Sequence, residues 1–391
     1  MAEDNQKNKQ IFLTESHSEQ DSMALLSHNL HNNVYESYQD KIAAIERLQD
    51  YWDSLFQKNE MAYEVRELSF NLDLFAGMQD IPFRTRQPSK FKFIDLFAGI
   101  GGIRLPFTEM GGDCVFSSEW DAAACKTYIG NFGDIPFGDI TKISAEFIPH
   151  HDVLLAGFPC QAFSIMGKMR GFEDTRGTMF FEVARILAYH HPKAILLENV
   201  KQLVGHDHGK TFKVILETLA EIGYHVKWKV LNALDFGLPQ KRERVIIVGF
   251  LDEKSCDAFN FKFAKRPYNL SSIIEDDAVV DPKLFASDMI RQKRLSCVEG
   301  KELFYPSIWH ENKSGNISVL PYACALRTGA SYNYLLINGY RRPSSRELLR
   351  LQGFPENYRI VVSHSNIRRQ TGNSVAVPMI RAVAKKIVEL L

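Results

Sequence analysis

The sequence contains no Cys-x-x-Cys pair and no apolar run that approaches the length of a membrane span. Its six cysteines are widely spaced, which argues against a structural zinc site and against a disulfide framework. They stand at positions 114, 125, 160, 256, 297 and 324. The first apolar stretch is short and follows a polar start of mixed charge, unlike a secretory signal. We therefore expect a cytoplasmic protein with reduced thiols, no metal and no membrane partner.

Net charge is also absent, but the charges are unevenly distributed along the chain. Residues 1–90 carry a net charge of −6, residues 91–250 of −1 and residues 251–391 of +7. A basic C-terminal third favours a polyanionic partner, although most charged side chains only solvate a surface. The chain is 45% hydrophobic and 24% charged, as globular proteins are, and its 391 residues allow two or three domains.

The first 90 residues have the composition of an extension ahead of a main domain. Residues 1–33 are polar, and we expect disorder at least as far as about residue 22. Between 38 and 68, apolar residues recur at three- and four-residue steps, which indicates one or two amphipathic helices packing on the main domain or on a partner. Two prolines mark residues 80–90 as a linker.

A single cysteine stands in the stretch 157–164 (GFPCQAFS), directly after an apolar run at 151–156 that predicts a buried strand. Pro159 fixes its own backbone and biases Phe158 towards extended geometry, so Cys160 stands on a stiff turn at a strand end. A thiol in that position suits a nucleophile. The alternative is a small buried hydrophobe, which is what most free cysteines are.

A glycine-rich turn at 95–102 (DLFAGIGG) follows another apolar run and leads into a predicted helix. Gly99, Gly101 and Gly102 have no side chains, so a ligand can approach the backbone closely. The pattern is neither G-x-G-x-x-G nor a phosphate-binding P-loop. Taken alone it is a weak signal for a nucleotide-type ligand.

Acidic residues at the next two strand ends strengthen that signal. An apolar run at 114–116 ends at Glu119, which is placed to accept hydrogen bonds from both ribose hydroxyls. Its neighbour Trp120 can stack on an adenine, and Asp139, after a third predicted short strand, could accept from an exocyclic amine. Glu119 alone could be a surface acid. The three elements in this order predict an adenosine-type cofactor.

The alternation of strands and helices continues to residue 250. A strand at 194–197 ends at Glu198, where burial would raise the pKa of the carboxyl and suit it to acid catalysis; a helix cap is the alternative. Arg242 and Arg244 lead into a strand at 245–250 and point the same way, which suits gripping a phosphate or a base carbonyl. Helices are predicted at 179–189 and 212–222, a strand at 226–231, and a surface loop at 167–177.

Periodicity is lost from about 251 to 335, which predicts a separate small domain. Regularity returns with a helix that is capped by Ser344 or Ser345 and runs through Leu351. The chain closes with the segment 371–378 (TGNSVAVP) and a helix at 379–390.

These motifs, in this order, resemble the DNA cytosine-5 methyltransferase family of bacterial restriction-modification systems. The resemblance covers about residues 91–250 and 341–391 and rests on FIDLFAGIGG, SSEWD, GDI, GFPCQAFS, ENV, PQKRERV, RExxRLQGFP and GNSVAVP. It implies an α/β fold: a doubly wound, Rossmann-like catalytic domain, a smaller irregular target recognition domain and a helical N-terminal extension. The expected boundaries are 1–90 for the extension, 91–254 and 336–391 for the catalytic and cofactor-binding domain, and 255–335 for target recognition.

The resemblance also implies a reaction and a set of site residues. Cys160 would add to carbon 6 of a cytosine flipped out of double-stranded DNA, Glu198 would be its acid partner, and S-adenosyl-L-methionine would supply the methyl group. Arg242 and Arg244 would anchor the target nucleotide. The residues implied to bind the cofactor are Phe97, Gly99, Ile100, Gly101, Gly102, Glu119, Trp120, Asp139, Ile140, Asn373 and Ser374. The residues implied to contact DNA are Gln161, Ser164, Arg242 and Arg244.

The sequence departs from the family pattern at Ala325, where many relatives carry the threonine of a Thr-Leu pair that supports the flipped base. That role is therefore not carried over. The resemblance further implies a monomer and a cognate restriction endonuclease that acts on the same site. Two alternatives stay open: a methyltransferase acting on tRNA cytosine, and a DNA-binding regulator with an N-terminal regulatory module. The large irregular region and the basic C-terminal third favour duplex DNA.

Overall fold

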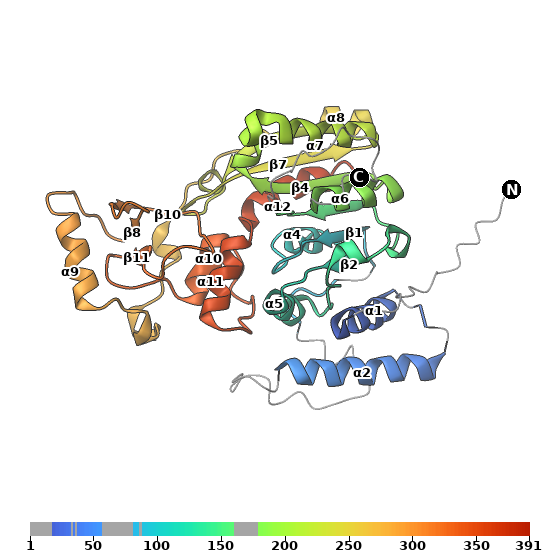
Figure 1. The fold of residues 1–391 in the computed structure, drawn as a ribbon, viewed down its shortest axis with the longest axis horizontal. Coiled ribbons are helices and arrows are strands. Elements are labelled where there is room, and N and C mark those ends of the chain that lie inside the picture. Colours follow the sequence, from blue (N-terminus) through green and yellow to red (C-terminus); the bar gives the residue numbers. More distant parts are fainter. Residues whose placement is uncertain (1–17, 33, 36, 57–80, 86–87, 160–178) are drawn as a thin grey trace.

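The computed structural model describes residues 18–32, 34–35, 37–56, 81–85, 88–159 and 179–391. Its centre is a six-stranded sheet with helices on both faces (Figure 1). A smaller three-stranded sheet lies at one end of the molecule, and two N-terminal helices lie along one side of the central sheet. The α/β, Rossmann-like fold with a helical N-terminal extension is thus confirmed.

The central sheet has the strand order β2-β1-β3-β4-β7-β5. Its strands are β1 (Phe91–Leu96), β2 (Gly112–Ser118), β3 (Val153–Ala156), β4 (Ala194–Val200), β5 (His225–Asn232) and β7 (Glu243–Phe250). The first four in spatial order are parallel, whereas β7 runs antiparallel to both β4 and β5. The inner strands are buried on both faces, which explains why they are continuous apolar runs in the sequence.

Alternate residues of each strand enter two separate hydrophobic cores, as the two-residue period of a strand requires. On one face, Ile94, Leu154 and Ile195 pack with residues of α5, α6 and α7 and of the N-terminal helix α1. On the other, Phe93, Leu155 and Leu196 pack with residues of α4, α8 and α12. These helices are α1 (Glu19–His31), α4 (Arg104–Glu109), α5 (Ala122–Phe132), α6 (Met179–His190), α7 (Lys210–Glu221), α8 (Glu253–Ala258) and α12 (Val377–Val388).

The third short strand predicted near Phe137 is a single bridge to Ser118. Asp139 then caps a 3-10 turn, because its side chain accepts a hydrogen bond from the backbone N–H of Thr141. The 3-10 segments are Ile140–Lys142, Ala145–Phe147, Lys201–Gly209, Ala233–Asp235, Leu270–Ser272, Asp277–Val279 and Pro282–Leu284.

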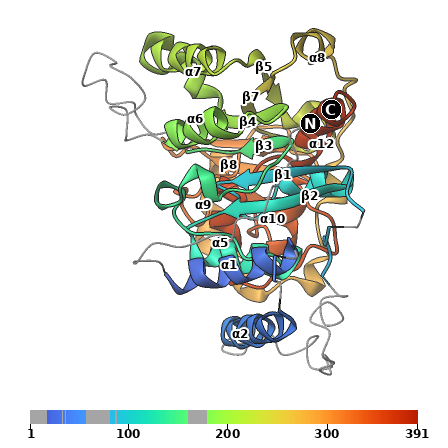
Figure 2. The same ribbon diagram turned by 90° about the vertical axis from the view of Figure 1, so that its right-hand side faces the viewer.

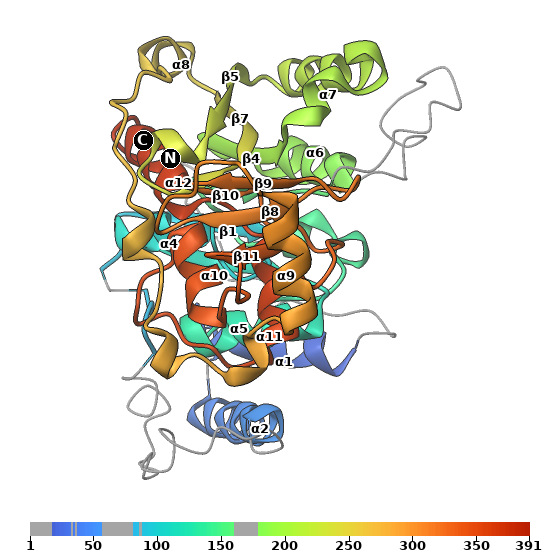
Figure 3. The same cartoon turned by 90° about the vertical axis from the view of Figure 1, so that its left-hand side faces the viewer.

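The irregular region holds α9 (Asp288–Cys297) and an antiparallel sheet of order β11-β8-β9, seen from its own side in Figure 3. The strands are β8 (Ile308–Glu311), β9 (Ile317–Leu320) and β11 (Leu335–Ile337). A small core of its own includes Trp309 and Leu336. A two-residue pairing of β10 (Ala323–Cys324) with β6 (Gln240–Lys241) connects this region to the rest of the chain.

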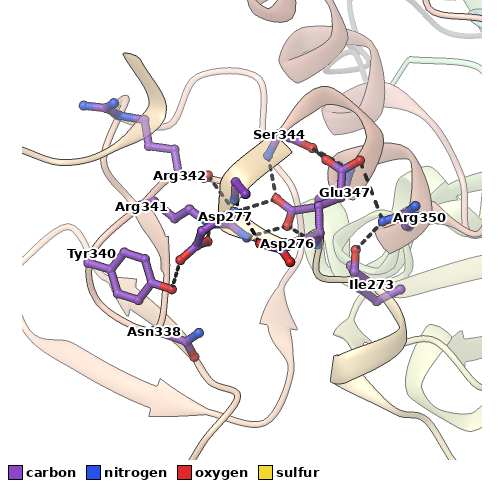
Figure 4. A network of polar contacts seen from close by, with 12 residues as sticks. Ile273, Asp276, Asp277, Asn338, Tyr340, Arg341, Arg342, Ser344, Glu347 and Arg350 are labelled. Atoms are coloured by element: carbon purple, nitrogen blue, oxygen red, sulfur yellow. Dashed lines mark hydrogen bonds and ion pairs between the residues drawn. The ribbon is translucent and has the colours of Figure 1, made fainter. Parts of the chain in front are cut away.

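A polar network fixes the irregular region to α10 (Ser345–Gln352), the helix that precedes α11 (His364–Asn373) (Figure 4). Ser344, one of the two predicted caps, caps α10, and it also forms a capping box with Glu347. The fully buried guanidinium of Arg341 pairs with the fully buried carboxylate of Glu347 at 2.9 Å and also bonds Asp277. The network therefore connects residues of the irregular region to the start of α10.

The helical part of the N-terminal extension begins earlier than the sequence predicted. Helix α1 starts at Glu19, so the expectation of disorder to about residue 22 is wrong for its first turn. Its inner face carries buried polar side chains, including Asp21 and His28, which hide the apolar periodicity. Helix α2 (Tyr38–Phe56) lies outside α1 (Figure 2). Residues 57–68, the rest of the predicted helical stretch, lie outside the described residues.

Candidate active site

The predicted site residues converge on one edge of the central sheet because the parallel strands end in register. Leu96 pairs with Ser118 of β2 and with Ala156 of β3, and Ala156 pairs with Leu197 of β4. The residues one step beyond this row are Phe97, Glu119, Gly157 and Glu198. Ligands of open α/β sheets bind at this carboxyl edge.

The beginning of the cysteine motif lies directly against Glu198. A Cβ atom built on Gly157 would stand 3.6 Å from Oε2 of Glu198. Phe158 is buried, and its carbonyl oxygen accepts a 2.9 Å hydrogen bond from Nδ2 of Asn199. The ends of β3 and β4 are therefore fixed to each other. Cys160, Gln161 and Ser164 lie outside the described residues.

Glu198 is a buried acid paired with a cation. Its side chain lies in β4, and Oε1 stands 2.8 Å from Nε of Arg244, which comes from β7. Burial raises the pKa of Glu198, while the charges of Arg244 and Arg242 oppose that rise. The strand continues past it to Val200, so Glu198 is not a helix cap. An acid that holds its proton to higher pH than usual suits proton donation.

Arg242 is buried more deeply than its neighbour and bonds three carbonyl groups. Its guanidinium donates to the backbone oxygens of Leu326 at 3.2 Å and Gly372 at 3.1 Å, and also to that of Ser374. Burial, reinforced by the positive charge of Arg244, lowers the pKa of Arg242 to about 9. Arg242 thus joins the irregular region to the segment 372–374, and Arg244 is the arginine that pairs with the acid.

The glycine-rich turn and Glu119 form one hydrogen-bonded unit. Gly99 has a φ of +56° and donates its backbone N–H to Oε2 of Glu119 at 2.8 Å, while Oε1 accepts from the N–H of Asp121 at 2.8 Å. Burial raises the pKa of Glu119, and those two N–H groups oppose the rise. Phe97 also has a positive φ, of 55°, which is uncommon outside glycine and marks a strained turn.

The remaining predicted cofactor residues surround this unit. The indole of Trp120 is 66% exposed, so one large aromatic face is available to a ligand. Ile100 and Ile140 are buried, and Asp139, next to Ile140, is half-buried. Phe137 accepts the N–H of Glu119 at 2.7 Å, which brings the chain before Asp139 beside Trp120.

The chain returns to the glycine-rich turn some 270 residues later, at Ser374 and Val375. A Cβ atom on Gly102 would stand only 2.8 Å from Oγ of Ser374 and 2.9 Å from Cγ2 of Val375. Asn373, the last residue of α11, is exposed. Gly102 is thus required by close packing against this segment, while Gly101 faces the ring of Phe132.

Several residues at this edge were missed by the sequence interpretation. Beneath the turn, buried Asp95 accepts from the hydroxyl of Tyr128 at 3.4 Å, and Tyr128 accepts from Arg104 at 2.9 Å. Burial raises the pKa of Asp95 to about 8, although Arg104 and Tyr128 oppose the rise. The signal that could have identified Asp95 is its position, because it is a carboxylate inside the apolar run 91–97. Gln20 and Asp21 of α1 also reach the site, and their sequence carries only a capping-box signal at Ser18.

Ala325 precedes a segment whose backbone packs against Gln240 and Gly372. The backbone N–H of Leu326 donates to Oε1 of Gln240 at 3.1 Å, and a Cβ atom on Gly372 would meet the backbone of Arg327 and Thr328 within 3 Å.

Among the described residues no group of three or more His, Cys, Asp or Glu could hold a metal ion. No helix in the described part of the chain is long and apolar enough to cross a membrane.

Comparison with known proteins decides the family. The model of the C-5 cytosine-specific DNA methylase family matches residues 91–389. The chain belongs to this family. The Type II methyltransferases M.HaeII of Haemophilus aegyptius and M.NgoBI of Neisseria gonorrhoeae are each 57% identical to it, over 305 and 302 residues; each match covers 77% of this chain and 94% of the relative. This methylase is therefore a sequence-specific DNA cytosine-5 methyltransferase of the restriction-modification type.

Solved structures agree on the fold of the methylase. A DNMT2 variant from Spodoptera frugiperda superposes with a TM-score of 0.59 at 21% identity, covering 76% of this chain and 99% of that one. The Entamoeba histolytica methyltransferase EhMeth gives 0.59 at 17% identity, covering 76% and 98%. The extension before residue 91 lies outside the family match of the methylase.

Proposed function

We propose that this methylase uses Cys160 as its nucleophile and Glu198 as its acid, with S-adenosyl-L-methionine as the methyl donor and duplex DNA as the substrate. One observation carries the proposal: Glu198, paired with Arg244, stands against the first residues of the cysteine motif, at the sheet edge that also holds Glu119 and the glycine-rich turn. The start of the cysteine motif, an acid and a candidate adenosine-type site thus share one edge.

The chemistry needs a thiolate and a proton at opposite ends of one ring. The Cys160 thiolate adds to carbon 6 of cytosine, and Glu198 gives its proton to ring nitrogen 3, so carbon 5 becomes an enamine carbon able to attack an electrophile. After methyl transfer, carbon 5 loses its proton to a base, the carbon–sulfur bond breaks, and the proton on nitrogen 3 returns to Glu198. The raised pKa of buried Glu198 supports this role.

S-adenosyl-L-methionine, when bound, supplies a methyl group on a positively charged sulfur. Glu119 would accept from the ribose hydroxyls and exposed Trp120 would stack on the adenine. Asp139 would accept from the adenine amine, and Asn373 and Ser374 would close the site beside Gly102. The residues fit the ligand because a strained glycine-rich turn, the half-buried carboxylate of Glu119 and an exposed indole lie together.

For the substrate we propose that residues 255–335 read the target sequence and that Arg244 holds the target nucleotide. Cation–aromatic pairs support a role at DNA: Tyr332 is 46% exposed and has the guanidinium carbons of Arg342 and Arg368 at 4.2 and 4.7 Å from its ring. Cytosine inside a duplex must be flipped out to reach Cys160. Action as a monomer, beside a cognate endonuclease, completes the proposal.

The test is methyl transfer from labelled S-adenosyl-L-methionine to plasmid DNA, followed by bisulfite sequencing. We expect methylated cytosines in one short repeated context, and none with Cys160→Ser. Cys297→Ser is the matched control, because Cys297 is exposed on α9. A Cys160→Ser protein that methylates DNA near the wild-type rate would refute the nucleophile. Label in tRNA but not in DNA would move the substrate to RNA, and label in neither would favour a DNA-binding regulator.

A further inference from the structure

The N-terminal helix α1, which lies outside the family match, packs on the loops of the proposed methyl-donor site. Its apolar residues Met23, Ala24 and Leu30 join the core on one face of the central sheet. The ring of buried His28 lies 5.0 Å from that of Phe137. Figure 2 shows α1 beside α5 and β2, on the same side of the sheet. This packing explains how α1 is held, but not what its first turn does.

The first turn of α1 bonds backbone groups of the cofactor loops. Nε2 of Gln20 stands 3.0 Å from the carbonyl oxygen of Glu119 and 3.0 Å from that of Pro136, with the sulfur of Cys125 at 3.2 Å. Its two hydrogens therefore suffice for one carbonyl on each of two separate loops. The Glu119 carbonyl forms the peptide bond to Trp120, so Gln20 fixes the backbone that carries both residues.

Asp21 bonds the neighbouring loop in the same way. Its Oδ1 accepts the backbone N–H of Gly138 at 2.8 Å, immediately before Asp139. Its Oδ2 accepts the hydroxyl of Ser18 at 2.8 Å, so the capping box orients the carboxylate. A Cβ atom on Gly138 would stand 3.2 Å from Oδ1 of Asp21, a contact that favours glycine there.

We propose that Gln20 and Asp21 are positioning residues for the methyl donor, which makes α1 a working part of the cofactor site. Two adjacent side chains hold the backbone directly before Trp120 and directly before Asp139. Those are the groups that would stack on the adenine and accept its amine, so the inference rests on the proposed function. A ligand site is precise only when the residues behind its contact groups are fixed.

The other end of α1 provides an anchor away from these loops. Nε2 of His31 stands 2.7 Å from Oδ1 of Asp113, and Nδ1 stands 3.5 Å from Oδ1 of Asp134. Since these contacts and the apolar packing do not involve Gln20, a change at Gln20 alone leaves the helix docked. Donor binding can therefore be separated from docking.

The experiment measures binding of S-adenosyl-L-methionine to the full-length protein by calorimetry, together with steady-state kinetics on DNA. Gln20→Ala removes both hydrogen bonds, and Gln20→Met removes them while it keeps the length of the side chain. Gln39→Ala is the matched control, because Gln39 is exposed at the start of α2. We expect both Gln20 variants to raise Kd and KM for the donor by about three- to tenfold, the effect of roughly one hydrogen bond. The kcat at saturating donor, the KM for DNA and the Gln39→Ala values should stay at wild-type levels.

Glu119→Ala separates the two possible failures. If Glu119→Ala weakens donor binding and both Gln20 variants bind within twofold of wild type, the positioning role is overturned and the proposed function stands. Gln20 variants that lower the melting temperature without raising KM for the donor would also overturn it, because that result describes docking only. If the wild-type protein binds no S-adenosyl-L-methionine, the proposed function fails and this inference fails with it.

Discussion

Replacing Gly102 with alanine should test how tightly the returning segment closes the glycine-rich turn. The added methyl group would stand 2.8 Å from Oγ of Ser374, 2.9 Å from Cγ2 of Val375 and 3.4 Å from the ring of Phe354. Neither close neighbour can withdraw easily: Val375 is buried, and the carbonyl of Ser374 is bonded by Arg242. Overpacking of this kind costs about 1–3 kcal/mol. If Ser374 moves to relieve the overpacking, the loss of affinity for the donor is limited by the same cost. A cost of about 1–3 kcal/mol corresponds to about a 5- to 150-fold loss.

The assay compares thermal unfolding and donor binding of Gly102→Ala with those of Gly205→Ala. Gly205 is exposed and a Cβ atom there meets nothing within 4 Å, so that variant should behave as wild type. We expect Gly102→Ala to melt at a lower temperature and to bind S-adenosyl-L-methionine more weakly. Unchanged melting and binding would show that Ser374 and Val375 yield freely, and would refute the argument from close packing.

Three further predictions concern charged groups. Glu198→Gln should lower kcat by about 10²–10⁴, because the amide cannot donate a proton to the base; single-turnover methylation measures it, and a loss below tenfold would exclude Glu198 as the acid. Burial opposes the charge of His31, but its hydrogen bonds to Asp113 and Asp134 raise its pKa to about 10. The free energy that protonated His31 contributes to folding is therefore fully present below about pH 6.5, the usual pKa of histidine. This contribution is lost as the pH rises through about 10. His31→Asn should accordingly lower the melting temperature most near pH 6 and hardly at all above pH 10; an equal loss at both would contradict this. Arg341→Leu should destabilise by about 3–5 kcal/mol, since it leaves buried Glu347 unpaired. In denaturant unfolding, the double variant with Glu347→Leu should recover part of that loss.

That the predicted site residues meet at one sheet edge could be inferred from the sequence, because the parallel part of the sheet is buried on both faces. Its strands contain apolar runs, and each run ends where the chain turns polar. Glu119 and Glu198 could therefore be assigned to the ends of these runs from the sequence alone, although β4 continues past Glu198 to Val200. In-register pairing then brings those ends together. The antiparallel direction of β7 was not predicted, because a buried strand has the same pattern in either direction.

Other parts of the site depend on partners that no local pattern identifies. Arg242 was expected to hold the target nucleotide because its side chain was predicted to point the same way as that of Arg244. That prediction could not identify the backbone carbonyl groups that Arg242 bonds. Helix α1 was missed because the helix face that packs on the sheet includes Asp21 and His28, so its apolar period is weak. Gln20 bonds two backbone carbonyl oxygens that lie 99 and 116 residues away. Every residue type has such an oxygen, so no sequence pattern identifies these two as partners.

The contacts of Arg242 have a consequence for how the protein is made. Its three carbonyl acceptors lie 84, 130 and 132 residues later in the chain, the last of them at Ser374. During synthesis, this guanidinium therefore lacks two of its acceptors until the segment 372–374 has left the ribosome. A truncated product that ends before Gly372 would have to bury a cation short of partners, at a cost of several kcal/mol. A chain that lacks the segment 372–374 therefore cannot satisfy Arg242 as the folded protein does.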